Sequence, residues 1–547
     1  MKKVFLALCL AAALATPSCI KVDNSLGKGL VDKSLLFDTY TAEFPLEEIQ
    51  LKASEALSGY SDTRIVIGAI RDEDFGLTTR EAAFTLIPQK DTIDLGTNPK
   101  AVSFLLNFAQ DTVSCSIDSQ ASIFQNIYVT ELTKQLPGSE DDTRNTQEIL
   151  HGTDIITKGL ISYSGTGDLT FNFTQEFAQK FVDAIVSVGP VFKDRSQDDG
   201  IDQYDAFVAL MPGIHLRTDE PEGLGGRINL FDLSCLSVSS NYYVRNNNVG
   251  LLTVNSTWNG VQKDSTFLII PGEPELYDEA EYIDNNTKFY QYSFNRTTQS
   301  TKAGPVTGNV LVEGGGGLKP VILARELQEK TLSAILAHGG DPEKAVIVKA
   351  TIVLPFNMPE DYTELKYFPS VLSPTIETTI TDDEGVERPT FAGLTDASVS
   401  SEDQGEIDRS NLVYKPDITY HLQELLTRTD LDTATNADIW LLTIHTEKVA
   451  EANGSLYDNE YYQNLMYASY YNALYGGGYG GYGGYGYGGY SNYYSYMMLA
   501  QMMSASTEQQ YSYTTELDKD RYYHAVLCGY GAKRHPIFRV TFNIPED

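Results

Sequence analysis

Residues 64–88 read RIVIGAIRDEDFGLTTREAAFTLIP and carry the pattern that decides the fold class. Two short apolar runs, 64–68 and 83–86, stand on either side of a group of Asp, Glu and Gly residues. Short runs rich in Ile, Val and Phe that end at turn-forming residues are typical of β-strands. The stretch therefore predicts strands and turns, not helices.

The same rhythm continues along the chain, with a strand-like run about every eight to fifteen positions. Further runs lie at 102–106, 127–129, 213–216, 267–270, 346–348, 439–444 and 538–542. Many short strands separated by turns are typical of antiparallel sandwiches. We expect a mainly β protein with two jelly-roll-like antiparallel β-sandwich units, a few short helices and a long Tyr/Gly-rich loop.

Three helices are predicted within this β pattern, at 174–185, 321–337 and 417–427. Thr174 and Asp417 stand in capping positions at the start of the first and third helices. Gly339 and Gly340 end the second helix, as glycine commonly does.

The domain organisation follows from the length of 547 residues, which favours two to four domains. The first and third helices each lie between strand-like runs, with 206–210 after one and 438–444 after the other, which is consistent with an internal duplication. We expect a signal peptide at 1–18, a lipidated tether with a first strand at 19–45, and sandwich units at 46–300 and 301–547. The second unit contains a Tyr/Gly/Met-rich insertion at about 450–515.

Composition and charge exclude several classes of protein. With 42 % apolar and 21 % charged residues, the chain has the composition of an ordinary folded protein. Its 74 acidic residues outnumber the 40 Lys and Arg, giving a formal charge of -34. Such an excess repels phosphate backbones and anionic lipids, which argues against nucleic-acid binding and polybasic membrane docking.

The N-terminus has the pattern of an export signal. Lys2 and Lys3 precede the apolar run 4–15, which is too short to cross a bilayer and ends just before Thr16-Pro17-Ser18-Cys19. A cysteine directly after such a stop carries the thiol that accepts a diacylglyceryl group, so Cys19 is the predicted lipidation site. Simple cleaved secretion is the alternative interpretation.

A low-complexity tract from 475 to 490 contains only Tyr and Gly, six tyrosines and ten glycines. Glycine at this density opposes regular packing, whereas tyrosine supplies rigid contact area at low entropic cost. The tract is either an insertion without regular structure or an aromatic contact loop. In the second case the predicted partner-binding residues are Tyr475, Tyr479, Tyr482, Tyr485, Tyr487 and Tyr490.

The common catalytic signatures are absent from the sequence. None of the seven histidines lies in H-E-x-x-H, no serine lies in G-x-S-x-G, and there is no phosphate-binding G-x-x-x-x-G-K-[ST] motif. The acidic groups at 72–74, 198–202 and 382–385 are best explained as solvated turns, and the glycine runs 223–226 and 314–317 as loops. We therefore predict no catalytic residue, no metal site and no cofactor.

The remaining cysteines, Cys115, Cys235 and Cys528, all lie in segments with a strand-like pattern and form no C-x-x-C motif. Buried small hydrophobic residues are the favoured interpretation, and a bridge between two of them is the alternative.

Five segments together resemble a known family: Ser18-Cys19, Ile67-Gly68, 72–76, 127–133, and 522–527 after the Tyr/Gly tract. They look like an uncharacterised family of Bacteroidetes outer-membrane lipoproteins, a domain of unknown function, and the resemblance covers nearly the whole chain. It implies an envelope location, on either the periplasmic or the surface face, and a β-rich fold. The resemblance implies no catalytic residue for this chain.

These observations favour a non-enzymatic envelope lipoprotein that binds or scaffolds. Its expected partners are the membrane, through the lipid anchor, and an envelope protein or glycan. The alternative is a glycan-binding or glycan-processing surface protein that uses paired carboxylates in a sandwich cleft.

Overall fold

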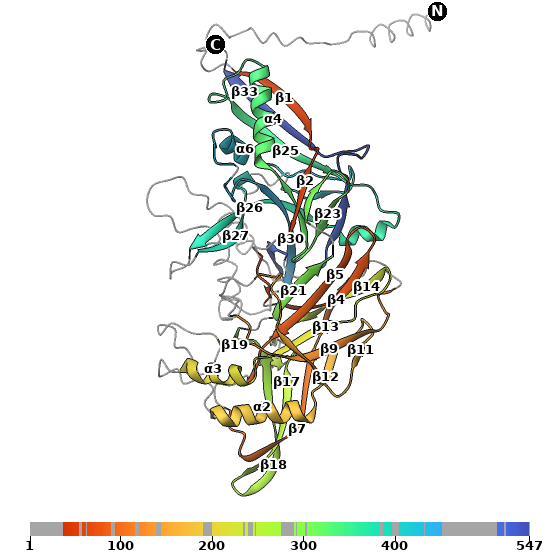
Figure 1. The fold of residues 1–547 in the computed structure, drawn as a ribbon, viewed down its shortest axis with the longest axis vertical. Coiled ribbons are helices and arrows are strands. Elements are labelled where there is room, and N and C mark those ends of the chain that lie inside the picture. The colour runs from red at the N-terminus through yellow and green to blue at the C-terminus, as the bar shows by residue number, and fades with distance from the viewer. Residues whose placement is uncertain are drawn as a thin grey trace, which may run out of the picture.

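The protein is described from a computed structural model (Figure 1). It covers residues 37–53, 57–61, 63–88, 93–114, 120–137, 144–189, 200–233, 236–238, 244–246, 248–274, 289–290, 293–300, 303–381, 387–396, 404–431, 433–450, 511–518 and 521–545. The predicted mainly β fold is confirmed, because antiparallel sheets make up most of the described structure.

The first unit is a sandwich of two antiparallel sheets, seen in the lower half of Figure 1. The larger sheet has the order β10 (His151–Ile155), β9 (Gln125–Leu132), β13 (Ile214–Thr218), β5 (Gly76–Phe84), β4 (Arg64–Asp72), β14 (Gly225–Asp232) and β8 (Gln110–Ser114), with β11 (Ile161–Tyr163), β21 (Ser293–Gln299) and β3 (Tyr60–Ser61) paired beside it. The smaller sheet has the order β12 (Leu169–Asn172), β7 (Thr97–Phe108), β17 (Gly250–Trp258), β18 (Val261–Pro271) and β6 (Leu86–Pro88). One hydrophobic core fills the space between them.

Two helices close one side of this core. In α2 (Gln175–Val188) the side chain of Thr174 accepts a hydrogen bond from the Phe177 backbone N–H, so the predicted helix and cap are confirmed. The next helix, α3 (Gly200–Leu210), packs on α2 through the rings of Phe181 and Phe207. The strand predicted at 206–210 is therefore wrong, because a short apolar run does not distinguish a strand from a buried helix face. The internal duplication was predicted because strand-like runs follow both the first and the third helix. Residues 206–210 are helical, so this similarity does not hold.

The second unit contains two further antiparallel sheets. One has the order β1 (Phe37–Pro45), β33 (Ile537–Pro545), β25 (Val346–Pro355), β29 (Val413–Tyr414) and β28 (Ile407–Asp408). The other has the order β22 (Gly304–Val306), β2 (Ile49–Ala53), β24 (Leu318–Ile322), β30 (Ile439–Ala450), β26 (Val371–Thr381) and β27 (Glu387–Gly393), with β31 (Tyr511–Leu517) beside β30. A short pair, β23 (Val310–Glu313) and β32 (His524–Leu527), joins the same core.

The N-terminal strands belong to this second unit. Along its whole length β1 pairs with β33, the last strand of the chain, and β2 pairs with β22 and β24. The sequence-based assignment of residues from 46 onward to the first unit is therefore wrong for β2. Strand pairing over such sequence separations leaves no local pattern from which a boundary can be read.

Two predicted helices of the second unit form with altered starts. The helix α4 (Ala324–Ala337) begins after β24, which takes up residues 321 and 322, and it ends before Gly339 and Gly340 as predicted. The helix α6 (Thr419–Leu425) begins after Ile418, so Asp417 lies one position before the cap, yet its Oδ1 atom still accepts the backbone N–H of Thr419 at 2.9 Å. The carboxylate of Asp396 accepts the next two backbone N–H groups of the first turn.

The Tyr/Gly tract lies outside the described residues, as does Cys19. The strands that flank the insertion, β30 and β31, pair with each other, and Ala450 lies opposite Tyr511. Among the described helices, none is both long enough and apolar enough to cross a membrane.

Candidate functional site

A pocket of about 360 Å³ lies where the two units meet. The turn between β4 and β5 forms one wall, and the segment 357–368, which includes the 3₁₀ helix η4 (Tyr362–Tyr367), forms another. The strand β32, the residues that follow it and Asn309, whose amide donates to Asp74 Oδ1 at 3.5 Å, complete the lining. We call it the seam pocket. Both units contribute residues to its lining.

Four carboxylates line the seam pocket: Asp72, Asp74, Glu360 and Glu364. The turn that carries the first two is fixed by Asp72, whose Oδ1 accepts the backbone N–H groups of Asp74 and Phe75 at 2.8 and 3.2 Å. The acidic group at 72–74 is thus a turn, as predicted, and it also faces a pocket, which the sequence did not indicate.

The imidazole of His524 lines the seam pocket from β32 and lies among three aromatic rings. Its centroid is 4.9 Å from that of Tyr367, 5.1 Å from that of Tyr522 and 5.7 Å from that of Phe75. Burial lowers the pKa of His524 to about 4, against an opposing effect of the Asp72 carboxylate. The imidazole is therefore neutral at pH 7, and its Nδ1 atom has no hydrogen-bond partner in the described structure.

Behind the pocket lies a cluster of buried charges. Glu313 on β23 stands directly opposite His524 in the strand register, and it is only 1 % exposed. Its carboxylate accepts hydrogen bonds from the hydroxyl of Thr78, at 2.6 Å, and from the amide of Gln299. Because Thr78 belongs to β5 and Gln299 to β21, this carboxylate joins the two units. Burial raises the pKa of Glu313, and the bond from Thr78 opposes the rise.

The ammonium group of Lys319 is the second buried charge of the cluster, with 0 % exposure. It donates to the backbone carbonyls of Glu313, Gly315 and Gly317. Burial lowers the pKa of Lys319 to about 7. Three carbonyl acceptors require the three N–H donors of the protonated form, so the geometry itself favours the charged ammonium.

The tetraglycine run 314–317 is the loop that wraps around Lys319. Gly315 has a φ of +56°, and a Cβ at Gly314 would lie 2.4 Å from the carbonyl oxygen of Arg521. At Gly317 a Cβ would lie 2.2 Å from the Cβ of Glu313. The sequence-based assignment to a loop was correct, and the need for glycine comes from close backbone approach, not from nucleotide binding.

A second polar cluster lies within the larger sheet of the first unit. His215 Nε2 is 3.4 Å from the carboxylate of Glu81, which Arg296 contacts at 3.2 Å, and the ring of His151 stacks on that of His215 at 4.0 Å. Burial lowers the pKa of His215, so the ring is neutral. Because His215 is completely buried, no substrate reaches it, and the cluster ties neighbouring strands together.

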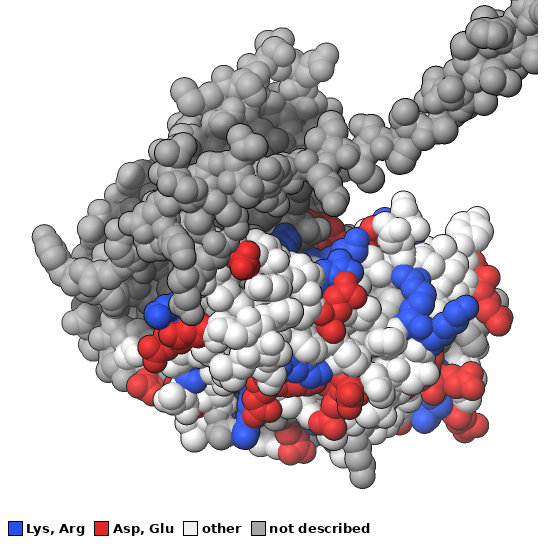
Figure 2. Space-filling view, turned by 90° about the horizontal axis from the view of Figure 1, so that it is seen from above, with Lys and Arg blue, Asp and Glu red and all other residues white. Residues whose placement is uncertain are grey.

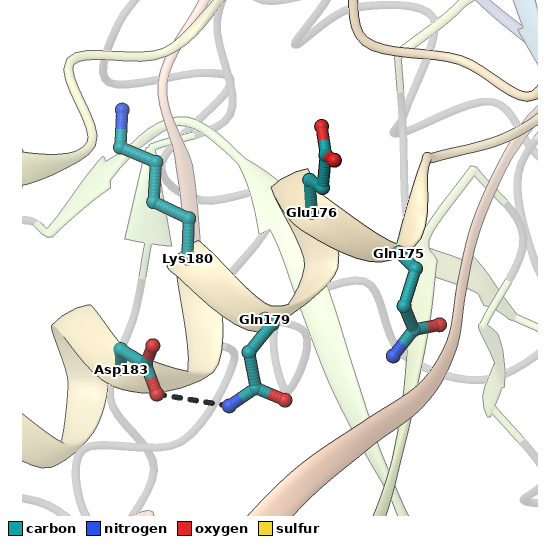
Figure 3. A pocket seen from close by; sticks show the side chains of 5 residues that line it. All are labelled: Gln175, Glu176, Gln179, Lys180 and Asp183. Atoms are coloured by element: carbon teal, nitrogen blue, oxygen red, sulfur yellow. Dashed lines mark hydrogen bonds between the residues drawn. The ribbon is translucent and has the colours of Figure 1, made fainter.

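Residues of α2 line a shallow hollow on the surface (Figure 3). The amide of Gln175 donates to the carbonyl of Ala101, and the amide oxygen of Gln179 accepts the backbone N–H of Ala101. Gln179 also donates to the carboxylate of Asp183 at 2.8 Å. The ammonium of Lys180 pairs with Glu131. These side chains attach α2 to the sheets, and the hollow is open surface.

The excess of negative charge is not concentrated on the face shown in Figure 2, where acidic and basic side chains are interspersed. The predicted lipidation site Cys19 and the six predicted tyrosines lie outside the described residues, so the structure places none of them. Cys528 is a free, buried thiol and one of the residues that line the seam pocket.

Comparison with known proteins adds no relative. No protein-family model matches the chain, and no curated protein or solved structure shows significant similarity to it. The resemblance to the Bacteroidetes lipoprotein family therefore stays a prediction.

Sequence reasoning missed the seam pocket because its lining comes from positions as distant as Asp72, Glu360 and His524. One local signal was available for the cluster behind it. Glu313 and Lys319 flank four glycines and lie within apolar, strand-like segments. Charged residues are unusual in such segments, because they are rarely buried unless they are paired.

Proposed function

We propose that this chain is a non-enzymatic, lipid-anchored binding module of the bacterial cell envelope, built from jelly-roll-like units, and that it engages its ligand in the seam pocket. The observation that carries the binding role is that a single pocket draws its lining from both units. Ligand pockets commonly form at domain interfaces and have volumes of about 300–1,000 Å³. A ligand held there would contact both units at once.

The anchoring part of the proposal rests on the sequence pattern that ends at Cys19. The first described strand begins at Phe37, so 17 residues separate it from Cys19. A lipid on Cys19 would hold the units near a membrane surface. Replacing Cys19 with Ala should move the chain from the membrane fraction to the soluble fraction, and retention after a high-salt wash would contradict lipid-only anchoring.

The binding part is tested with two variants from the same exposed segment. Met358 lines the seam pocket and is 50 % exposed, whereas Tyr362 is 74 % exposed and lies outside the lining. Met358→Arg should obstruct the pocket and reduce ligand capture from envelope extracts about tenfold. Tyr362→Arg adds the same charge nearby and should leave capture unchanged. Equal capture by both variants would place binding elsewhere, with the Tyr/Gly tract as the next candidate.

A glycan-processing role is the second candidate, because the seam pocket combines carboxylates on two walls with the rings of Phe75 and Phe368. Glycoside hydrolysis needs two carboxylates that flank the scissile bond. If this role holds, the chain should release reducing sugar from envelope glycans, and the variant Asp74→Asn/Glu360→Gln should not. No release by the wild-type chain would eliminate it.

A further inference from the structure

The side chains that line the seam pocket carry a net negative charge. Four carboxylates contribute to the lining, and the lining residues include no Lys or Arg within the described structure. His524 does not offset the negative charge, because its imidazole is neutral at pH 7. A pocket of this sign attracts a cation and repels phosphates and carboxylates.

The floor of the seam pocket has the opposite character. Phe75 and Leu527 are each 1 % exposed, and Phe368 and Val526 line the pocket beside them. This floor offers apolar contact to a ligand beneath the charged rim. A hydrated inorganic ion gains nothing from such contact, whereas an alkyl chain does.

A metal ion is disfavoured by a further observation. Among the described residues, no group of three or more His, Cys, Asp or Glu side chains is placed to hold one. The carboxylates at the rim thus supply negative charge, but they are not arranged to coordinate a metal ion. A cation that needs only electrostatic attraction and hydrogen bonds fits this arrangement better than one that needs direct coordination.

His524 gives an independent sign that a ligand belongs in the pocket. Its ring contributes to the lining, yet its Nδ1 atom, which is inaccessible to solvent, has no hydrogen-bond partner in the described structure. Buried polar atoms are almost always paired, so an unpaired one at a pocket needs an explanation.

We infer that the seam pocket binds a small organic cation, an alkylamine whose ammonium group lies among the rim carboxylates and whose alkyl chain lies on the apolar floor. The inference rests on the proposed binding function and names the chemical class of its ligand. A volume of about 360 Å³ accommodates a chain of several carbons with its ammonium group.

The test uses the full-length chain, purified in detergent, and three probes of matched length. Titration calorimetry with 1,5-diaminopentane should show binding that weakens as salt is raised, because salt screens the partly exposed carboxylates. The neutral 1,5-pentanediol and the anionic pentanedioate should bind at least about tenfold more weakly. Equal binding of diamine and diol would overturn the inference, and binding of Ca²⁺ in preference to the diamine would replace it with a metal site.

Paired variants locate the site. Asp74→Asn/Glu360→Gln removes two rim charges and should weaken diamine binding about tenfold. The control, Asp154→Asn/Glu343→Gln, removes two exposed charges outside the pocket and should leave binding unchanged. An equal effect of both pairs would mean that only the net charge of the chain attracts the amine, which overturns the assignment. If diamines fail to bind while Met358→Arg still reduces envelope capture, the ligand class is wrong and the proposed function stands.

Discussion

Phe75, in the turn between β4 and β5 of the first unit, packs against His524, on β32 of the second unit, in an edge-on arrangement. Their ring centroids are 5.7 Å apart and their planes meet at 78°. Phe75 is 1 % exposed and belongs to the hydrophobic core of the second unit, although the rest of its hairpin belongs to the first. The first unit therefore inserts a side chain into the core of the second.

Two further contacts strengthen this junction. The carboxylate of Glu313 accepts the hydroxyl of Thr78, and the guanidinium of Arg80 donates to the carbonyl of Gly314 at 2.7 Å. Thr78 and Arg80 lie on β5, whereas Glu313 and Gly314 belong to the second unit. Buried charges that lose a partner are costly, so these bonds make the relative placement of the units specific.

Phe75→Ala should destabilise the protein by about 3–5 kcal/mol, since it removes a fully buried aromatic ring and leaves a cavity. Because the ring joins two cores, we expect urea unfolding to separate into two transitions. Circular dichroism and tyrosine fluorescence would follow them. The control is Phe124→Ala, because Phe124 is 72 % exposed and its loss should cost less than about 0.5 kcal/mol. A loss as small for Phe75 as for Phe124 would contradict the insertion.

Local pattern was sufficient for much of the fold. The strand run at 64–68 lies in β4, the run at 83–86 covers the end of β5 and the start of β6, and the spacing of Phe177, Phe181 and Ile185 predicted α2 with its Thr174 cap. Both signals depend on side-chain periodicity within a dozen residues. The sequence was therefore informative wherever one local face is buried.

Gly314→Ala should destabilise the protein by about 1–3 kcal/mol, because the added Cβ meets backbone atoms of Arg521 and Tyr523 at 2.4 and 2.7 Å. Backbone atoms move less easily than a flexible side chain. Thermal unfolding would measure the effect. Gly223→Ala is the matched control, since a Cβ there meets nothing within 4 Å, and no loss of stability is expected. Equal melting temperatures for the two variants would mean that the loop around Lys319 adapts freely.

Long-range pairing is where sequence reasoning failed. β1 meets β33 across the whole chain, and Ile49 of β2 lies opposite Val306 of β22. The seam pocket is assembled from such contacts, so Asp72 and Asp74 were interpreted only as part of a solvated turn, and Glu360 and Glu364 were not singled out. At α6 the nearby Asp417 accepts one backbone N–H of the first turn, but Asp396, which accepts the next two, lies more than twenty residues before the helix and was not predicted.

His524→Phe tests the neutral imidazole. At pH 7 the variant should be as stable as the wild type or more stable by about 1 kcal/mol, because an unpaired polar atom is replaced by a ring of similar shape. Below pH 6.5 the unfolded imidazole takes up a proton while the folded one, with a pKa of about 4, does not. Wild-type stability should therefore fall between pH 6.5 and 4, and this component should be missing in the variant. Parallel urea midpoints for the two proteins over this range would refute the assignment.

The last prediction concerns the Tyr/Gly tract. Its flanking strands already pair, with Ala450 opposite Tyr511, so the connecting segment of about 60 residues closes a loop whose ends are held together by β30 and β31. Deleting 475–490 shortens this loop to about 44 residues, which changes the entropy of closure by about 0.3 kcal/mol. The melting temperature should therefore hardly change.

A variant with the six tyrosines replaced by serine keeps the length and removes the aromatic contacts. If the tract is a contact loop, both variants should lose ligand capture from envelope extracts at unchanged stability. Full capture by both would make the tract a spacer and leave binding to the seam pocket, and a large drop in melting temperature on deletion would show that the tract packs against the folded core.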